Sequence, residues 1–153
     1  MLRLAFLIST LLACSGLVAA SPAHAHPAAG RTSVVVVMKA PSCGVCATQL
    51  RALAAAELGA PVVGITHGSQ GAAAQVTRRT GVRTYSHPAG IQAMGLWLPE
   101  LGIAQPAVVV FDRCGREAGR IVGRQPGVDV SERARALVKQ ADAVTRCEAK
   151  PVS

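Results

Sequence analysis

The sequence SVVVVMKAPSCGVC, residues 33–46, combines a run of valines with two closely spaced cysteines. The apolar run, residues 34–38, has no polar alternation, which is typical of a strand buried on both faces of a parallel sheet. Residues 43–58 are rich in Ala and Leu and are followed by Gly59, a pattern that predicts a helix. We therefore expect Cys43 at the point where a buried strand ends and a helix begins.

A position at the start of a helix changes the chemistry of a cysteine. The first backbone N–H groups of a helix have no partners within the helix, and the helix dipole favours negative charge there. A thiolate would supply that charge, so we expect a lowered pKa for the Cys43 thiol. Cys46 follows at the spacing of one helical turn, which brings the two sulfur atoms close enough to bond.

Composition and charge limit the classes of protein to consider. The chain has 153 residues, half of them apolar and only 3% aromatic, so one domain with a core of Val, Leu, Ile and Ala is expected. The formal net charge is +8. The basic residues are scattered and no aromatic side chains alternate with them, so nucleic acid is not an expected partner. A solvated surface that attracts acidic partners or anionic membrane is the better interpretation.

The N-terminal residues 1–25 have the features of a secretory signal peptide. Arg3 precedes an apolar segment, residues 4–13, and Ala23-His24-Ala25 is a cleavage pattern. Cleavage after Ala25 would give an exported protein, periplasmic or otherwise extracytoplasmic. The alternative is lipoprotein processing at Cys14, because residues 11–14 resemble a bacterial lipobox. Only in that case would the protein be held at a membrane.

The remaining chain is predicted to contain a lead-in over residues 26–32, one domain over 33–148 and a tail over 149–153. Asp129 and Glu132 suggest a capping box at the start of the last helix. The order of the elements predicts an α/β fold, a mixed sheet with helices on both faces and a central α-β-α insertion. The expected strands are 33–39, 62–66, 82–86, 107–111 and 119–123, and the expected helices are 43–58, 72–80, 89–98 and 129–146.

Three features together resemble the thioredoxin superfamily. Cys43-Gly44-Val45-Cys46 fits its C-x-x-C motif at a strand-to-helix junction, and Gln105-Pro106-Ala107 matches its cis-proline position. Residues 111–123 resemble its closing hairpin. The segment 68–98 resembles the insertion of exported bacterial thioredoxin-like proteins. The resemblance extends over residues 33–147 and implies a thioredoxin-like fold.

The resemblance also implies roles for individual residues. Cys43 would be the nucleophile that opens a partner disulfide, and Cys46 would resolve the mixed disulfide. Pro106 would follow a cis peptide bond and expose backbone to the substrate, and Gln105 would influence the choice of partner. Two simpler interpretations remain open: Cys43 and Cys46 could form a purely structural disulfide, and Pro106 could simply open an edge strand.

Two residues depart from the pattern of the superfamily. Ser42 replaces the aromatic residue that usually precedes the first cysteine, which affects how partners would dock. Val37 replaces the buried acid that thioredoxin places six residues before that cysteine. The second departure removes a proton acceptor for the buried cysteine and should slow its activation or leave that task to water.

Two further cysteines, Cys114 and Cys147, are expected at the end of the sheet away from Cys43. Cys114 lies in the predicted hairpin turn over residues 112–115, and the last helix should run back from the Cys43 end and bring Cys147 to the same place. We predict a disulfide between them; the alternative is two unpaired buried thiols. The even number of cysteines after residue 25 fits an oxidising compartment.

The predicted function is that of an exported thiol–disulfide oxidoreductase, an enzyme that acts on protein disulfides or dithiols and needs no cofactor and no metal. A second redox protein would recycle the Cys43–Cys46 pair. Gly44-Val45 does not fix the direction of electron flow. The alternatives are a thioredoxin-like copper carrier using Cys43, Cys46 and His87, since Cu(I) suits thiolate ligands, and a redox-inert scaffold. A zinc half-site is disfavoured, because no second ligand pair has finger spacing.

Overall fold

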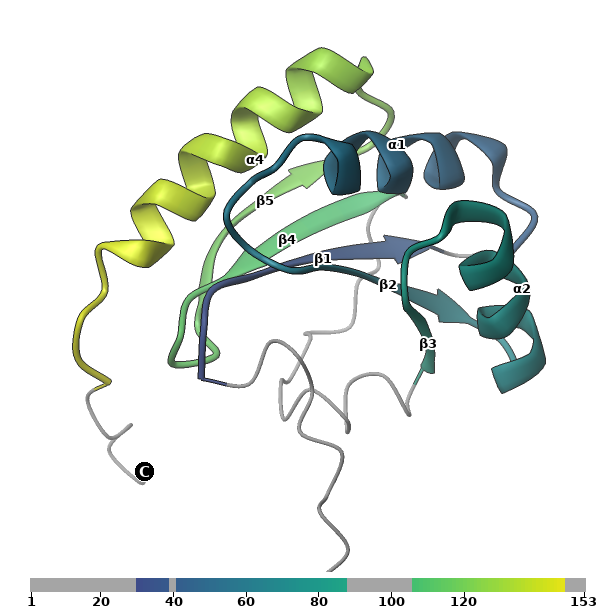
Figure 1. The fold of residues 1–153 in the computed structure, drawn as a ribbon, viewed down its shortest axis with the longest axis horizontal. Coiled ribbons are helices and arrows are strands. Elements are labelled where there is room, and N and C mark those ends of the chain that lie inside the picture. Colours follow the sequence, from purple (N-terminus) through teal and green to yellow (C-terminus); the bar gives the residue numbers. More distant parts are fainter. Residues whose placement is uncertain (1–29, 39–40, 88–105, 148–153) are drawn as a thin grey trace, which may run out of the picture.

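A five-stranded mixed sheet organises the fold, with strand order β3-β2-β1-β4-β5 for β1 (Ser33–Met38), β2 (Val62–His67), β3 (Thr84–His87), β4 (Ala107–Phe111) and β5 (Glu117–Val122). The computed structural model describes residues 30–38, 41–87 and 106–147 (Figure 1). Parallel pairing joins β1 to β2 and β2 to β3. Antiparallel pairing joins β4 to β1 and to β5, so the predicted mixed sheet is confirmed.

Several predicted segments lie outside the described residues. They include the signal peptide over residues 1–25 with Cys14, the first part of the lead-in, Gln105, the helix expected over 89–98 and the tail over 149–153. Of the expected α-β-α insertion, the first helix and the strand are described. The strand, β3, forms the edge of the sheet next to β2.

The central strand β1 is buried on both faces, as its run of valines predicts. Val34, Val36 and Met38 belong to the apolar cluster on one face, and Val35 and Val37 belong to the cluster on the other. All five side chains are 1% exposed or less. The β-branched valines suit the extended backbone and fill both sides of the sheet with apolar surface, which makes β1 the rigid centre of the domain.

Three described helices, α1 (Gly44–Ala55), α2 (Gln70–Thr80) and α4 (Gly127–Asp142), lie on the same face of the sheet (Figure 1). Leu50 and Leu53 of α1, Val76 of α2 and Val130 and Val138 of α4 share one apolar cluster with β1. Each helix thus buries one apolar stripe against the sheet. Among the described helices, none is both long and apolar enough to cross a membrane.

The structure shifts both ends of the last helix relative to the sequence-based expectation. The predicted capping box of Asp129 and Glu132 is wrong: α4 begins at Gly127, Pro126 occupies the N-cap position, and the N-cap residue makes no side-chain capping bond. A proline suits a helix start because it has no N–H to leave unpaired. Asp129 lies instead in the first turn, where the helix dipole stabilises its negative charge.

The helix that follows the cysteines also ends earlier than expected. α1 stops at Ala55, because the chain turns at Glu57, which has a φ of 47°. This left-handed turn directs Leu58 into the apolar cluster instead of continuing the helix. In contrast, α2 ends as predicted at Thr80, and Gly81 takes the left-handed conformation with a φ of 72°.

The hairpin between β4 and β5 turns at the residues expected. Gly115 N–H donates to the Asp112 carbonyl at 3.0 Å. The Asp112 carboxylate accepts from the backbone N–H groups of Cys114 and Arg116 at 2.8 and 2.9 Å. Asp112 is buried and its charge also meets the Arg116 guanidinium at 3.1 Å. These bonds fix the turn that carries Cys114.

A disulfide joins Cys114 to Cys147, with Cα atoms 5.3 Å apart. β5 runs from the hairpin turn toward the end of the sheet at which β1 ends, and α4 returns from there, so Cys147 reaches the turn. The chain leaves the helix after Asp142 to make this connection, which explains why α4 ends before the predicted residue 146. At the same end of the sheet, the Thr32 hydroxyl donates to the Asp142 carboxylate.

We predict that replacing both cysteines, Cys114→Ser with Cys147→Ser, lowers the free energy of unfolding by about 3–4 kcal/mol, because the unfolded chain loses a long covalent loop. The bridge spans a sequence separation of 33, against 3 for Cys43–Cys46. Guanidinium denaturation of the oxidised proteins measures the change. The free energy of unfolding should fall less in the matched variant, Cys43→Ser with Cys46→Ser. An equal fall in both variants would contradict this account.

Candidate functional site

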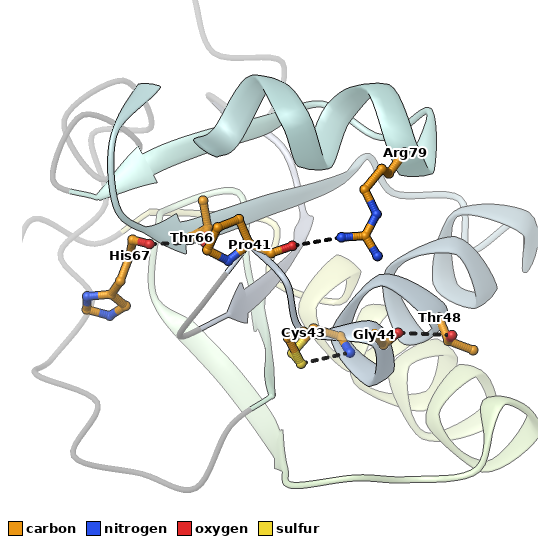
Figure 2. The surroundings of a disulfide bond; sticks show 8 residues. Pro41, Cys43, Gly44, Thr48, Thr66, His67 and Arg79 are labelled. Carbon is orange, nitrogen blue, oxygen red and sulfur yellow. Dashed lines mark hydrogen bonds between the residues drawn. A yellow bond between two sulfur atoms is a disulfide. The ribbon is translucent and has the colours of Figure 1, made fainter. Parts of the chain in front are cut away.

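Cys43 is the N-cap residue of α1, at the point where the chain leaves β1. Its backbone is extended, with φ −63° and ψ 102°. The backbone N–H of Cys46 donates to Cys43 Sγ at 3.2 Å, so the sulfur atom takes the place that a serine or aspartate oxygen takes in many helix caps (Figure 2). The first turn of α1 contains no acidic residue. Nothing negatively charged in that turn opposes charge on Cys43.

The two cysteines of the C-x-x-C pair form a disulfide, with Cα atoms 5.3 Å apart. Their exposure differs: Cys43 is half-buried, whereas Cys46 is 1% exposed. A partner protein can therefore reach only one of the two sulfur atoms directly. The arrangement suits an outer sulfur that meets a partner and an inner sulfur that closes the bridge.

The surroundings of Cys46 are apolar. Its cluster includes Val36 and Met38 of β1 and Leu50 of α1. Val37, which stands where thioredoxin has a buried acid, belongs to the cluster on the opposite face of the sheet. Among the described residues, the one buried carboxylate is that of Asp112, which lies in the hairpin turn at the opposite end of the sheet from Cys46. A proton leaving Cys46 would therefore pass to water or to the partner.

The loop before Cys43 is held by an arginine from α2. The Arg79 guanidinium donates to the Pro41 carbonyl at 3.1 Å, and Figure 2 shows this side chain extending across to the loop. Ser42, the residue in the usual aromatic position, is exposed. On the helix side, the Thr48 hydroxyl donates to the Gly44 carbonyl at 3.1 Å.

Pro106 lies at the same end of the sheet as Cys43. It is buried and directly precedes β4, whose first residue Ala107 pairs with Val37 near the end of β1. The Pro106 carbonyl accepts from Gly123 N–H at 2.8 Å. Gln105 lies outside the described residues, so the predicted cis bond between Gln105 and Pro106 stays a prediction.

The histidines do not add a described metal site. His67 ends β2 and its side chain is exposed. His87 ends β3, next to His67 in the strand register. Within residues 30–38, 41–87 and 106–147, no group of three or more His, Cys, Asp or Glu side chains is arranged to hold a metal ion.

A groove next to the disulfide contains residues that the sequence analysis did not single out. It has a volume of about 870 Å³ and is lined by Gly44 and Val45 of the C-x-x-C motif, by Gln49 and Arg51 of α1, and by Arg79 and Arg124. Helical spacing alone places Thr48 and Arg51 on one face of α1. It could not reveal that α2 and the loop before α4 converge there.

Comparisons with known proteins relate this chain to others through structure alone. No protein-family model and no curated protein matches the sequence. A secreted Mycobacterium tuberculosis disulfide oxidoreductase homologous to E. coli DsbE is 22% identical, with a TM-score of 0.50, over 71% of this chain and 83% of its own.

Two further solved structures show the same similarity. A thiol:disulfide interchange protein of the thioredoxin family from Chlorobium tepidum is 22% identical, with a TM-score of 0.50, over 74% of this chain and 81% of its own. Peroxiredoxin Q from Xanthomonas campestris is 15% identical, with a TM-score of 0.52, over 75% of this chain and 82% of its own. These matches show that the chain has a thioredoxin-like fold, as the resemblance implied.

The cap geometry predicts the ionisation of Cys43 in the reduced protein. Because the helix start stabilises a thiolate, the pKa of Cys43 should lie at least one unit below the value of about 8.5 for free cysteine. The rate of iodoacetamide alkylation against pH, with the modified residue identified by peptide mass mapping, measures it. The denatured protein serves as the control, and the same midpoint in both states would contradict the prediction.

Proposed function

We propose that this protein is an exported thiol–disulfide oxidoreductase that exchanges disulfides with other proteins through Cys43 and Cys46. The single observation that carries the proposal is the placement of the pair: the outer sulfur caps the first turn of α1, and the inner sulfur lies one turn further in. A thioredoxin-like fold alone would be compatible with several activities. The accessible, helix-capping cysteine favours thiol exchange among them.

The proposed reaction has two steps. The Cys43 thiolate attacks one sulfur of a partner disulfide, the partner S–S bond breaks, and a partner thiolate leaves. A mixed disulfide now joins Cys43 to the partner. The Cys46 thiolate then attacks Cys43 Sγ, which releases the second partner thiolate and forms the Cys43–Cys46 disulfide. Two electrons have passed to the partner, and protons from solvent complete its two thiols.

The remaining residues would have supporting roles in this scheme. The apolar cluster around Cys46 would keep the inner sulfur buried until the mixed disulfide forms. Pro106 lies at the same sheet end, and with Gln105 it would offer backbone and side-chain contacts to the substrate. The same two steps run in reverse when the protein oxidises a dithiol, so the reduction potential of the Cys43–Cys46 pair, measured against glutathione, would distinguish a reductant from an oxidant.

Trapping the mixed disulfide tests the proposed roles. The Cys46→Ser variant should accumulate a covalent complex with an oxidised protein substrate such as insulin, because nothing resolves the bond. The Cys43→Ser variant should accumulate none and should lose turnover of insulin by about two orders of magnitude or more. Non-reducing gels and a turbidity assay measure both effects.

The outcome also separates the alternatives. Turnover of insulin by the wild-type protein that is no faster than turnover by Cys43→Ser would identify the bridge as part of a redox-inert scaffold. Stoichiometric Cu(I) binding by the reduced protein that survives competition, together with inactivity toward disulfides, would identify a copper carrier instead. A complex trapped equally by both single-cysteine variants would contradict the assignment of an outer and an inner sulfur.

Export is the second part of the proposal. The signal-like residues 1–25 support it, and so do the two disulfides, since stable disulfides are typical of oxidising compartments. The secreted mycobacterial oxidoreductase offers a parallel in fold. We propose a periplasmic or other extracytoplasmic location, with membrane attachment only if Cys14 is lipidated.

Intact-mass analysis of the protein made from the full sequence in a bacterial host tests the export proposal. Cleavage after Ala25 should give a soluble product beginning at His26 in the extracytoplasmic fraction. A product beginning at a lipid-modified Cys14 would establish the anchored alternative. An uncleaved chain that remains in the cytoplasm with reduced Cys114 and Cys147 would contradict export.

A further inference from the structure

The groove beside the disulfide is cationic. Arg51, Arg79 and Arg124 line it, and no carboxylate does in the described part of the chain. The salt bridges among the described residues involve Arg116 and Arg120, so none of these three arginines is neutralised by an acid there. The whole chain carries a net charge of +8, which would strengthen the positive potential at such a recess.

The three arginines come from different elements and converge on one recess. Arg51 lies on α1, Arg79 in the last turn of α2 and Arg124 between β5 and α4. Arg79 is positioned by its hydrogen bond to the Pro41 carbonyl, which leaves other N–H groups of the guanidinium for a ligand. An arginine guanidinium suits a carboxylate, because its planar fork can donate two parallel hydrogen bonds.

The wall of the groove also contains a buried polar group without a partner. Gln49 lines the groove and is only 2% exposed, and neither its Nε2 nor its Oε1 has a hydrogen-bond partner among the described residues. An unsatisfied buried amide is unfavourable. Both polar atoms of Gln49 are buried, so the side chain would have to turn outward to pair with a ligand in the groove, and the pairing would relieve that cost. One donor and one acceptor on the same amide match the C=O and N–H groups of a peptide backbone.

We propose that this groove binds an acidic segment of the protein that exchanges disulfides with Cys43. Carboxylates of the segment would meet Arg51, Arg79 and Arg124, and its backbone would pair with the Gln49 amide. The inference rests on the proposed function for the identity of the partner.

The position of the groove suits this role. Gly44 and Val45, the residues between the two cysteines, form part of its lining. A chain segment lying in the groove would therefore continue to the Cys43 sulfur within a few residues. Binding of the segment would raise the local concentration of a partner disulfide at the nucleophile, and charge complementarity would increase the rate of encounter.

Binding of short cysteine-free peptides, labelled with an uncharged fluorophore, tests the groove independently of redox chemistry. The peptides alternate Gly with Glu, Gln or Lys, and fluorescence anisotropy with the oxidised wild-type protein measures affinity. We expect the Glu peptide to bind about tenfold more tightly than the Gln peptide at low ionic strength, with the preference falling as salt is added. Equal affinity for the two peptides would overturn the proposal.

Matched variants locate the effect. Arg51→Gln with Arg124→Gln should weaken binding of the Glu peptide about five- to tenfold. The control, Arg78→Gln with Arg113→Gln, removes the same charge from exposed positions that do not line the groove, and should change affinity less than about twofold. An equal loss of affinity in both double variants would show that the overall charge of the protein attracts the peptide. That result would overturn the proposal that the peptide binds in the groove.

Gln49→Leu tests the backbone contact. The substitution should weaken binding of the Glu peptide and of the Gln peptide to the same extent. The midpoint of thermal unfolding should stay the same or rise, because an unpaired amide is removed. Unchanged affinity for both peptides would overturn the role given to Gln49.

A separate assay keeps the two proposals distinguishable. Exchange of the wild-type protein with the uncharged 2-hydroxyethyl disulfide depends on the cysteine pair and not on acidic recognition. If the protein exchanges with 2-hydroxyethyl disulfide but does not prefer the Glu peptide, the proposal that the groove binds acidic segments is wrong. The proposal of an oxidoreductase then still stands. The preference without activity would overturn the oxidoreductase and support an acidic-peptide site on a thioredoxin-like fold.

Discussion

The hydrogen bond from the Cys46 backbone N–H to the Cys43 sulfur is the contact on which the site depends. It exists because a strand buried on both faces ends at Met38 and a helix begins at Gly44. The valine run fixes the strand in the middle of the sheet, and the apolar stripe of α1 fixes the helix above it. The sulfur atom therefore lies at the start of a helix whose direction the core determines.

The site is asymmetric in two respects. One sulfur atom is accessible and the other is buried in an apolar cluster. The C-x-x-C motif lies at the same end of the sheet as Pro106, and Gly44 and Val45 of the motif line a groove with three arginines. Different elements supply these two features: α1 positions the sulfur atoms, whereas α2 and the loop before α4 contribute positive charge.

The sequence predicted those features that depend on local pattern. Uninterrupted valines identified β1, the i, i+3 cysteines and the following Ala- and Leu-rich residues identified the start of α1, and Asp and Gly at the ends of residues 112–115 identified the hairpin turn. The direction of each strand then placed Cys114 and Cys147 at the same end of the sheet, where the structure joins them.

The features that depend on competing or distant contacts could not be predicted in this way. Asp129 and Glu132 have the spacing of a capping box, but Pro126 allows the helix to begin earlier. Glu57 takes a left-handed conformation because Leu58 is buried, and no local signal indicates that burial. The groove requires three elements to converge, and the unpaired amide of Gln49 becomes visible only when its neighbours are in place.

The Cys114–Cys147 bridge has a consequence for the order in which the molecule matures. It closes a covalent ring that contains β5 and α4. A narrow secretion channel that admits one extended thread cannot easily pass such a ring, which would have to enter as two strands at once. In a chain that is threaded across a membrane, the ring must therefore close after passage, and its closure marks the compartment in which folding is completed.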